Sequence, residues 1–116
     1  MKLERELLKG VAPLVVLEIL TRGKMYGYEL SEAVAQRSGN TLHLGRGTLY
    51  PLLYNLEAKQ LVKGQWEDKA GARKRRYYSI TSRGKKHLAQ QKQQWEQLQT
   101  AVNAVLASPT PKAVLT

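Results

Sequence analysis

The sequence predicts a mainly helical fold with a small β-hairpin, in which a winged helix-turn-helix precedes one long helix. Three observations predict it. Three segments with helical boundaries precede residue 60, two segments of alternating polarity at 61–67 and 75–80 form a hairpin, and a heptad-spaced segment follows Thr81. The order of these elements, more than any one of them, indicates the fold.

Composition limits the classes of protein to which the chain can belong. Its 116 residues suit one domain with an appended helix, and the absence of Cys excludes disulfides, thiolate zinc sites and Cys nucleophiles. Because His43 and His87 are the only histidines, we expect no metal site and no cofactor. No apolar run approaches the roughly 20 residues that span a bilayer, and the N-terminus does not resemble a signal peptide. We therefore expect a cytoplasmic protein with no membrane partner.

Positive charge is concentrated in one part of the chain. The formal net charge is +10, and residues 59–86 alone carry 10 Lys and Arg against 2 Asp and Glu. A basic patch on an otherwise balanced chain is typical of proteins that bind polyanions, which here predicts association with the nucleoid. The alternative is a surface that serves only solubility, although interspersed charge of either sign would suffice for that.

The first two helices are predicted from apolar spacing and end signals. Residues 3–9 form a short amphipathic stretch that Gly10 interrupts, and a buried helix covers 13–20, with Pro13 at its first position. Residues 27–37 form the second helix, which carries Leu30 on its apolar face.

The third helix, over residues 46–59, is the predicted recognition helix. Leucines at 49, 52, 53 and 56 form its apolar stripe, and Pro51 removes at most one backbone hydrogen bond. Its other face carries hydroxyl and amide groups, which can bond phosphates and base edges. The predicted DNA contacts are Arg46, Thr48, Tyr50, Pro51, Tyr54 and Asn55. Alternatively, Tyr50 or Tyr54 packs against the long helix.

The hairpin has a basic tip. Five cations fall within eight residues, and phosphates would relieve their mutual repulsion and release counterions. The cations predicted to contact DNA are Lys69, Arg73, Lys74 and Arg75. The fifth, Arg76, can instead face inward beside Trp66, and a merely solvated loop is the alternative for the whole tip.

The last helix is predicted over 82–106, with Thr81 as its N-cap. Apolar residues three and four apart along it form a coiled-coil seam, with one polar position at Gln91. The predicted dimer interface and effector site comprise Leu7, Leu8, Leu88, Trp95, Leu98, Val102 and Val105. The expected domains are a DNA-binding domain over 1–81, a dimerisation helix over 82–107 and a disordered tail over 108–116.

Trp95 lies in the middle of this seam and leaves two interpretations open. A bulky indole can hold two helices apart, so that a planar aromatic or phenolic effector stacks against it. An aromatic residue at helical spacing is more often simple interface packing.

Catalysis finds no support in the sequence. The segment GRG at 45–47 is too short for a phosphate-binding loop, and the nine carboxylates form no evident pair. We therefore expect no enzyme.

The segments LLKGVAPLVVLEIL, MYGYEL, GRGTLYPLLYNLEAKQLV and RRYYSITSRGKKHL, between residues 7 and 88, together resemble the PadR family of transcriptional regulators. The single C-terminal helix is similar to that of the smaller subclass. The resemblance implies a homodimer that binds a palindromic operator in double-stranded DNA, usually as a repressor of efflux, detoxification, phenolic-acid or stress genes. It places Tyr50 on the recognition helix and Arg73 on the wing.

Two other classes remain open at this point. One is a winged-helix module that docks a partner protein, which the basic wing disfavours because interface cores are depleted in Lys. The other is an architectural protein that binds any DNA sequence. Repression and activation are not distinguished by the residues.

Overall fold

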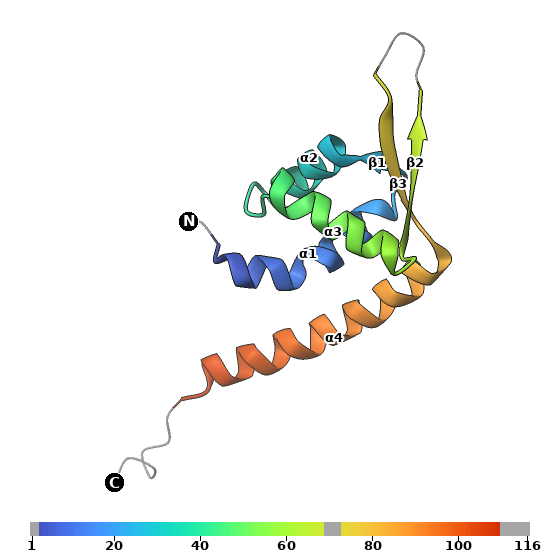
Figure 1. Ribbon diagram of the computed structural model, residues 1–116. Helices are drawn as coiled ribbons and strands as arrows, with labels where there is room; N and C mark the ends of the chain where they lie inside the picture. The colour runs from blue at the N-terminus through green and yellow to red at the C-terminus, as the bar shows by residue number, and fades with distance from the viewer. Residues whose placement is uncertain (1–2, 69–72, 110–116) are drawn as a thin grey trace.

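The computed structural model describes residues 3–68 and 73–109 and confirms the predicted fold class (Figure 1). A helical head carries a β-hairpin, and a long helix leaves the head on the side away from the end of β2 and the beginning of β3. The elements in chain order are α1 (Arg5–Leu20), β1 (Met25–Tyr26), α2 (Gly27–Arg37), α3 (Arg46–Ala58), β2 (Val62–Glu67), β3 (Arg75–Ile80) and α4 (Ser82–Ala107).

The prediction of a break at Gly10 and a new helix at Pro13 was wrong. Helix α1 is continuous, and Pro13 lies inside it. Its second half buries Val16, Leu17 and Leu20 in the core. Tertiary packing of that face therefore outweighs the lost backbone hydrogen bond at proline and the poor helix propensity of glycine.

The hairpin belongs to a three-stranded antiparallel sheet of order β1-β3-β2, whose short first strand the sequence did not predict. Met25 pairs with Tyr78 and Tyr26 with Tyr77, so β3 is the central strand. Two residues are too few to show the alternation by which strands are recognised. Strand β1 ties the beginning of α2 to the wing, which is the hairpin formed by β2 and β3.

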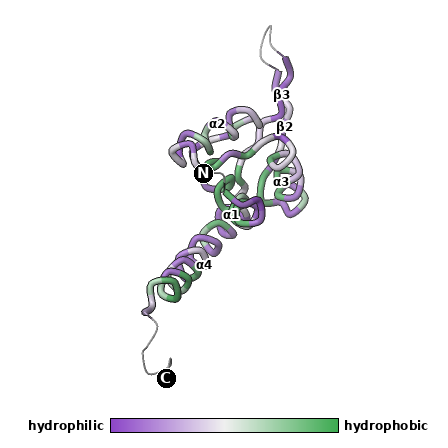
Figure 2. The backbone as a smooth tube through the Cα atoms, turned by 90° about the vertical axis from the view of Figure 1, so that its left-hand side faces the viewer, coloured by the Kyte–Doolittle hydropathy of each residue, from purple (hydrophilic) through white to green (hydrophobic). Residues whose placement is uncertain are grey.

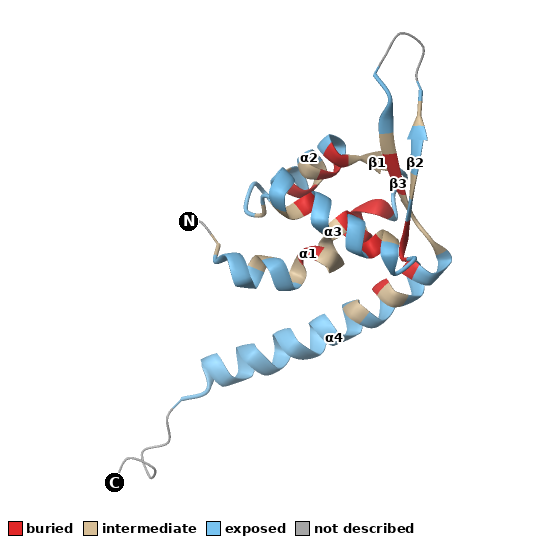
Figure 3. Ribbon diagram, viewed as in Figure 1, coloured by how far each residue is buried: buried red, intermediate tan, exposed pale blue. Residues whose placement is uncertain are grey.

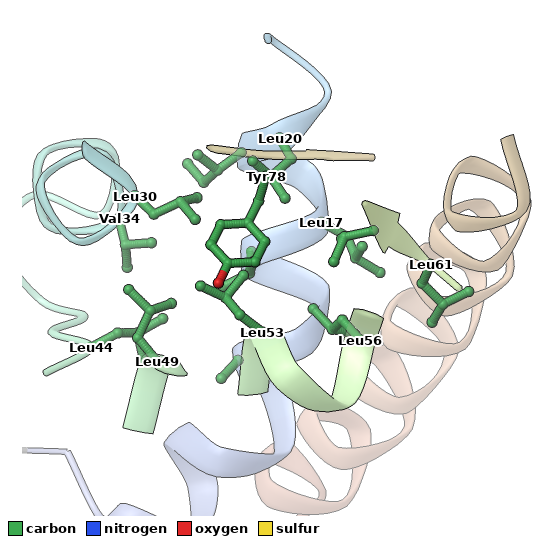
Figure 4. Packing of buried hydrophobic residues seen from close by; sticks show 14 of the residues in the cluster. Leu17, Leu20, Leu30, Val34, Leu44, Leu49, Leu53, Leu56, Leu61 and Tyr78 are labelled. Carbon is green, nitrogen blue, oxygen red and sulfur yellow. The ribbon is translucent and has the colours of Figure 1, made fainter. Parts of the chain in front are cut away.

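One hydrophobic core joins every element of the head to the start of α4. Leu17, Leu30 and Leu53, from three different helices, are fully buried, and the ring of Tyr78 from the sheet lies among them (Figure 4). Burial raises the pKa of Tyr78, and the nearby Arg76 guanidinium only partly offsets this effect. The Tyr78 phenol is therefore neutral and packs as an aromatic core residue.

Helix α3 ends in a Schellman motif that turns the chain into the wing. The Leu61 N–H donates to the Leu56 carbonyl and the Gln60 N–H to the Glu57 carbonyl, both at 2.9 Å. Gln60 takes the left-handed conformation, with φ of 62°. This cap satisfies two carbonyls at the end of α3 and buries Leu61 between α3 and α4.

Helix α4 begins at the predicted N-cap. The Gly84 N–H donates to Thr81 Oγ1 at 2.9 Å, and the Thr81 hydroxyl also contacts the Gln60 carbonyl at 2.7 Å. Beyond its first turns α4 is largely exposed, and hydrophobic residues recur in its last turns (Figures 2 and 3). The expected disordered tail over 108–116 lies, from residue 110 onward, outside the described residues.

Leu88 corrects the predicted seam. Its side chain is 5% exposed and packs in the core of its own chain, so it is not available to a partner subunit. Of the residues predicted for the seam on α4, those that remain exposed begin with Trp95.

Two helical glycines give a matched test of how closely α4 approaches the head. A Cβ at Gly84 would collide with the Leu61 carbonyl oxygen and lie 2.8 Å from Ile80 Cγ1, whereas a Cβ at Gly10 meets nothing within 4 Å. We expect Gly84→Ala to lower the free energy of unfolding by roughly 1–3 kcal/mol, as overpacked sites do. Gly10→Ala should raise it by about 0.5–1 kcal/mol through helix propensity.

Urea unfolding of both variants at one fixed protein concentration checks this prediction. Equal stabilisation by the two substitutions would contradict the close approach of α4 to Leu61.

Candidate nucleic-acid interface

Helix α3 presents a continuous exposed face. Its leucines at 49, 53 and 56 are buried, and the opposite face is open to solvent. Of the predicted DNA contacts, those exposed on α3 are Arg46, Tyr50, Pro51, Tyr54 and Asn55. Tyr54 is 77% exposed, so packing of this side chain against α4 is excluded within the monomer. Thr48 is half-buried and turns toward α1.

Tyr50 lies across the beginning of α2. A Cβ at Gly27 would collide with the Tyr50 hydroxyl oxygen and lie 2.8 Å from its Cζ, so Gly27 provides the space for this ring. Tyr50 remains 42% exposed. Its ring therefore links the two helices of the helix-turn-helix while one side stays accessible to a ligand.

The wing carries exposed cations along β3 and just before it. Arg73, Lys74 and Arg75 are all exposed, whereas Lys69 lies outside the described residues. Lys74 approaches Asp68 only to 3.9 Å, and both side chains are more than 60% exposed, so this ion pair is weak. These cations are available to bind phosphates.

Arg76 takes the inward alternative. Its Nη2 lies 2.6 Å from Glu57 Oε2, and its guanidinium is 5.7 Å from the Trp66 ring and 5.8 Å from the Tyr78 ring. The expectation of five mutually repelling cations is corrected accordingly, because the charge of Arg76 is compensated by a carboxylate of α3.

Two tyrosines at the beginning of α2 were missed as candidates for ligand contact. Tyr28 is 65% exposed and stacks on Tyr26 at 6.5 Å, while the Arg75 guanidinium covers the Tyr26 ring at 4.4 Å. A hydrogen bond with Glu32 raises the pKa of Tyr28, so its phenol stays protonated. The signal was the repeated Tyr of MYGYEL, but its link to the wing depends on β1, which the sequence did not predict.

Two basic residues of α1 were also missed. Arg5 and Lys9 border a groove of about 440 Å³ between α1 and α3, opposite Thr48 and Asn55. Their spacing of four residues places them on one side of a helix, but the expected break at Gly10 concealed their position relative to α3. Glu6 lines the same groove, so this edge of the recognition helix carries two cations and one carboxylate.

Trp95 borders three neighbouring cavities between α4 and the head. One of about 420 Å³ brings the indole together with Leu7 and Leu8, and one of about 310 Å³ adds Leu98. The third, of about 300 Å³, has Glu18, Arg37 and Lys92 at its edge. The structure thus places the predicted residues of α1 next to Trp95, while Leu88 does not border these cavities.

The seam beyond Trp95 is exposed. Trp95 is 39% exposed, and the apolar residues that follow it at seam spacing are Leu98, Val102 and Val105, all solvent-exposed. The exposed fractions of Leu98, Val102 and Val105 are 57%, 45% and 75%.

Residues 3–68 and 73–109 contain neither a cluster of metal ligands nor a membrane-spanning helix. Within these ranges no group of three or more His, Asp or Glu side chains is placed to hold a metal ion. No helix there is long and apolar enough to cross a membrane.

Comparison with known proteins identifies a consistent set of relatives. Residues 16–90 match the family model described as the Transcriptional regulator PadR-like family. A solved PadR family transcriptional regulator from Eggerthella lenta is similar over 90% of this chain and 88% of its own, with a TM-score of 0.80 and 32% identity. A PadR-like transcriptional regulator from Bacillus cereus covers 90% of this chain and 99% of its own, with a TM-score of 0.75 and 33% identity.

A more distant relative is the transcriptional regulator YqjI of Escherichia coli. It is 28% identical over 95 residues, which are 82% of this chain but 44% of that protein. The likeness therefore concerns less than half of the larger regulator.

Substitution of two adjacent residues of α3, Tyr54 and Leu53, should affect DNA binding and folding stability separately. We expect Tyr54→Ala to weaken duplex DNA binding about tenfold, the size of one lost contact. Because Tyr54 is exposed, the free energy of unfolding should change by no more than about 0.5 kcal/mol. The control Leu53→Ala removes a fully buried side chain and should cost about 2–5 kcal/mol of stability.

Fluorescence anisotropy with a labelled duplex and urea unfolding measure the two quantities. Unchanged DNA affinity in Tyr54→Ala would remove this residue from the interface.

Proposed function

This chain belongs to the PadR-like family of transcriptional regulators, and we propose that it is a homodimeric repressor that binds a palindromic operator. Its family assigns it DNA binding and regulation of transcription rather than catalysis. The observation that carries the proposal is the exposed face of α3 together with the exposed cations of the wing, whose strand β2 follows α3 directly (Figure 1); together they offer a surface to a duplex. Such a protein acts at the nucleoid.

Dimerisation is supported by the exposed stripe on α4. Trp95, Leu98, Val102 and Val105 are solvent-exposed on α4, a helix that is largely exposed beyond its first turns (Figure 3). An apolar stripe at coiled-coil spacing is stabilised when two copies pack against each other. Leu7 of α1 is also exposed and borders the same space, so it extends this face.

Operator recognition is supported by the two edges of α3. In a symmetric dimer two recognition helices would enter successive major grooves about 34 Å apart. Arg73, Lys74 and Arg75 on the wing would bind backbone on one side of α3, and Arg5 and Lys9 would do so on the other. Two copies arranged this way would recognise the two halves of a palindrome. A dimer bound at a promoter would exclude RNA polymerase and so repress transcription.

Binding to the chain's own upstream region, compared with random duplex across a salt series, tests this proposal. We expect the upstream region to bind at least ~1000-fold more tightly than random DNA, with two chains per site. Mass photometry of the complex gives the stoichiometry.

Equal binding to both duplexes, with the same steep salt dependence, would instead indicate an architectural protein. Binding to neither duplex would favour a module that docks a partner protein.

Ligand control is supported by the cavities around Trp95. An indole beside apolar walls is suited to stacking with a planar aromatic or phenolic effector. The effector would change how α4 packs and so favour one separation of the two heads over another, as any ligand-driven shift requires. Compounds of this kind fit a regulator of efflux, detoxification or stress genes.

Tryptophan fluorescence measures this binding because the chain has only two Trp residues. In the variant Trp66→Phe, titration with acridine or coumarin should quench Trp95 and lower operator affinity. The control Trp95→Phe retains Trp66 and should show neither effect. Quenching of Trp95 without any change in operator affinity would mean that the site is not regulatory.

A further inference from the structure

Glu57, near the end of the recognition helix α3, is bonded to both strands of the wing. Its Oε2 accepts a hydrogen bond from Arg76 Nη2 of β3 at 2.6 Å and another from the Gly64 N–H of β2 at 3.2 Å. Both charged side chains are 31% exposed, so the pair lies partly within the protein. A single carboxylate oxygen therefore joins three elements.

The wing is shaped to receive this ion pair. Gly64 lies opposite Tyr78 in the β2–β3 register, and a Cβ at Gly64 would lie 2.7 Å from Arg76 Nε and Nη2. The guanidinium thus occupies the space that a side chain at position 64 would fill. The rings of Trp66 and Tyr78, both within 6 Å of it, add cation–π attraction.

We propose that Glu57 and Arg76 form a positioning clamp that sets the specificity of DNA binding, by fixing the wing to the recognition helix and withholding one cation from phosphates. The proposal rests on the DNA-binding function of the family. Neither side chain is assigned a contact with bases. Both act through the placement of α3 and of the wing cations.

The first part of the argument is geometric. A two-stranded hairpin is marginally stable alone, and here β1 supports β3 over only two residue pairs, so that Arg75 and Arg76 of β3 pair with β2 alone. DNA must contact α3 and the wing together. A wing already fixed to α3 loses less conformational freedom on binding, and it accepts fewer alternative positions on a duplex.

The second part is electrostatic. Contacts to phosphates strengthen binding to every sequence alike. An additional free arginine therefore raises affinity for random DNA without improving discrimination between sequences. Arg76 directly follows the exposed Arg75 in β3, on the face of the wing that meets Glu57, so a guanidinium released from that carboxylate would face the recognition helix side of the wing. Its compensation by Glu57 therefore lowers non-specific binding.

The substitution Glu57→Gln removes the carboxylate charge and tests both parts. We expect affinity for random duplex to rise, with a salt slope steeper by about 0.9 for the one added phosphate contact. The ratio of operator to random affinity should fall roughly tenfold, within the range for residues coupled in one network. The control Glu96→Gln changes the net charge equally at an exposed position of α4 and should leave the ratio unchanged.

Two further variants keep the test decisive. Glu57→Asp retains the charge but shortens the side chain, so the ratio should fall while random-duplex affinity stays within about twofold. The double variant Glu57→Gln with Arg76→Gln should return random-duplex affinity to that of the wild type without restoring the ratio. If Glu57→Gln fails to fold, the ratio of operator to random-duplex affinity in Glu57→Asp alone tests the proposal.

The proposal would be overturned if the ratio of operator to random-duplex affinity in the Glu57 variants equalled the ratio in Glu96→Gln. So would a rise in random-duplex affinity that survives loss of Arg76. Amide exchange at Gly64, measured without DNA, should accelerate in Glu57→Asp, and unchanged protection would show that the clamp does not hold the wing. If no operator is found, the proposed function fails, yet random-duplex affinity and Gly64 exchange still test the clamp.

Discussion

The carbonyl oxygen of Leu61 joins the DNA-binding head to the long helix. It accepts hydrogen bonds from the Thr81 N–H and from the Thr81 hydroxyl, both at 3.1 Å, and the absence of a side chain at Gly84 lets α4 pass directly over it. The same residue closes the cap at the end of α3. Because recognition helix, wing and α4 meet at one buried residue, the direction of α4 relative to α3 is set there.

The features that the sequence predicted correctly depend on local chemistry. The leucine stripe of α3 and the Thr81 cap follow from helical spacing and from hydroxyl chemistry within a few residues. Strand β1, the continuity of α1 through Pro13 and the burial of Leu88 depend on contacts between distant segments. Periodicity does not encode those contacts. The surface at α2 and the groove beside α1 could not be predicted for that reason.

The basic segment serves two purposes that a count of charges does not separate. Arg75 and Arg76 are adjacent, and strand geometry alone sends them to opposite faces of the sheet. The Arg75 guanidinium covers the half-buried ring of Tyr26, while Arg76 reaches a carboxylate nineteen residues earlier in the chain. Only the fold supplies that partner. Part of the charge that indicated a polyanion ligand is thus used within the protein, and the exposed remainder is the part that we propose to bind DNA.

The length of α4 connects the two proposed activities. Its 26 residues extend about 39 Å, and Trp95 lies about 20 Å along it from Thr81. The ion pair between Lys92 and Glu18, at 2.6 Å, is exposed and therefore weak, so the fixed point of α4 is at Leu61 rather than near the indole. A ligand that separates α4 from α1 at Trp95 would turn the helix about that fixed point. In a dimer held together by α4, such a rotation would change the separation of the two recognition helices. That separation must match the spacing of the two half-sites in the operator.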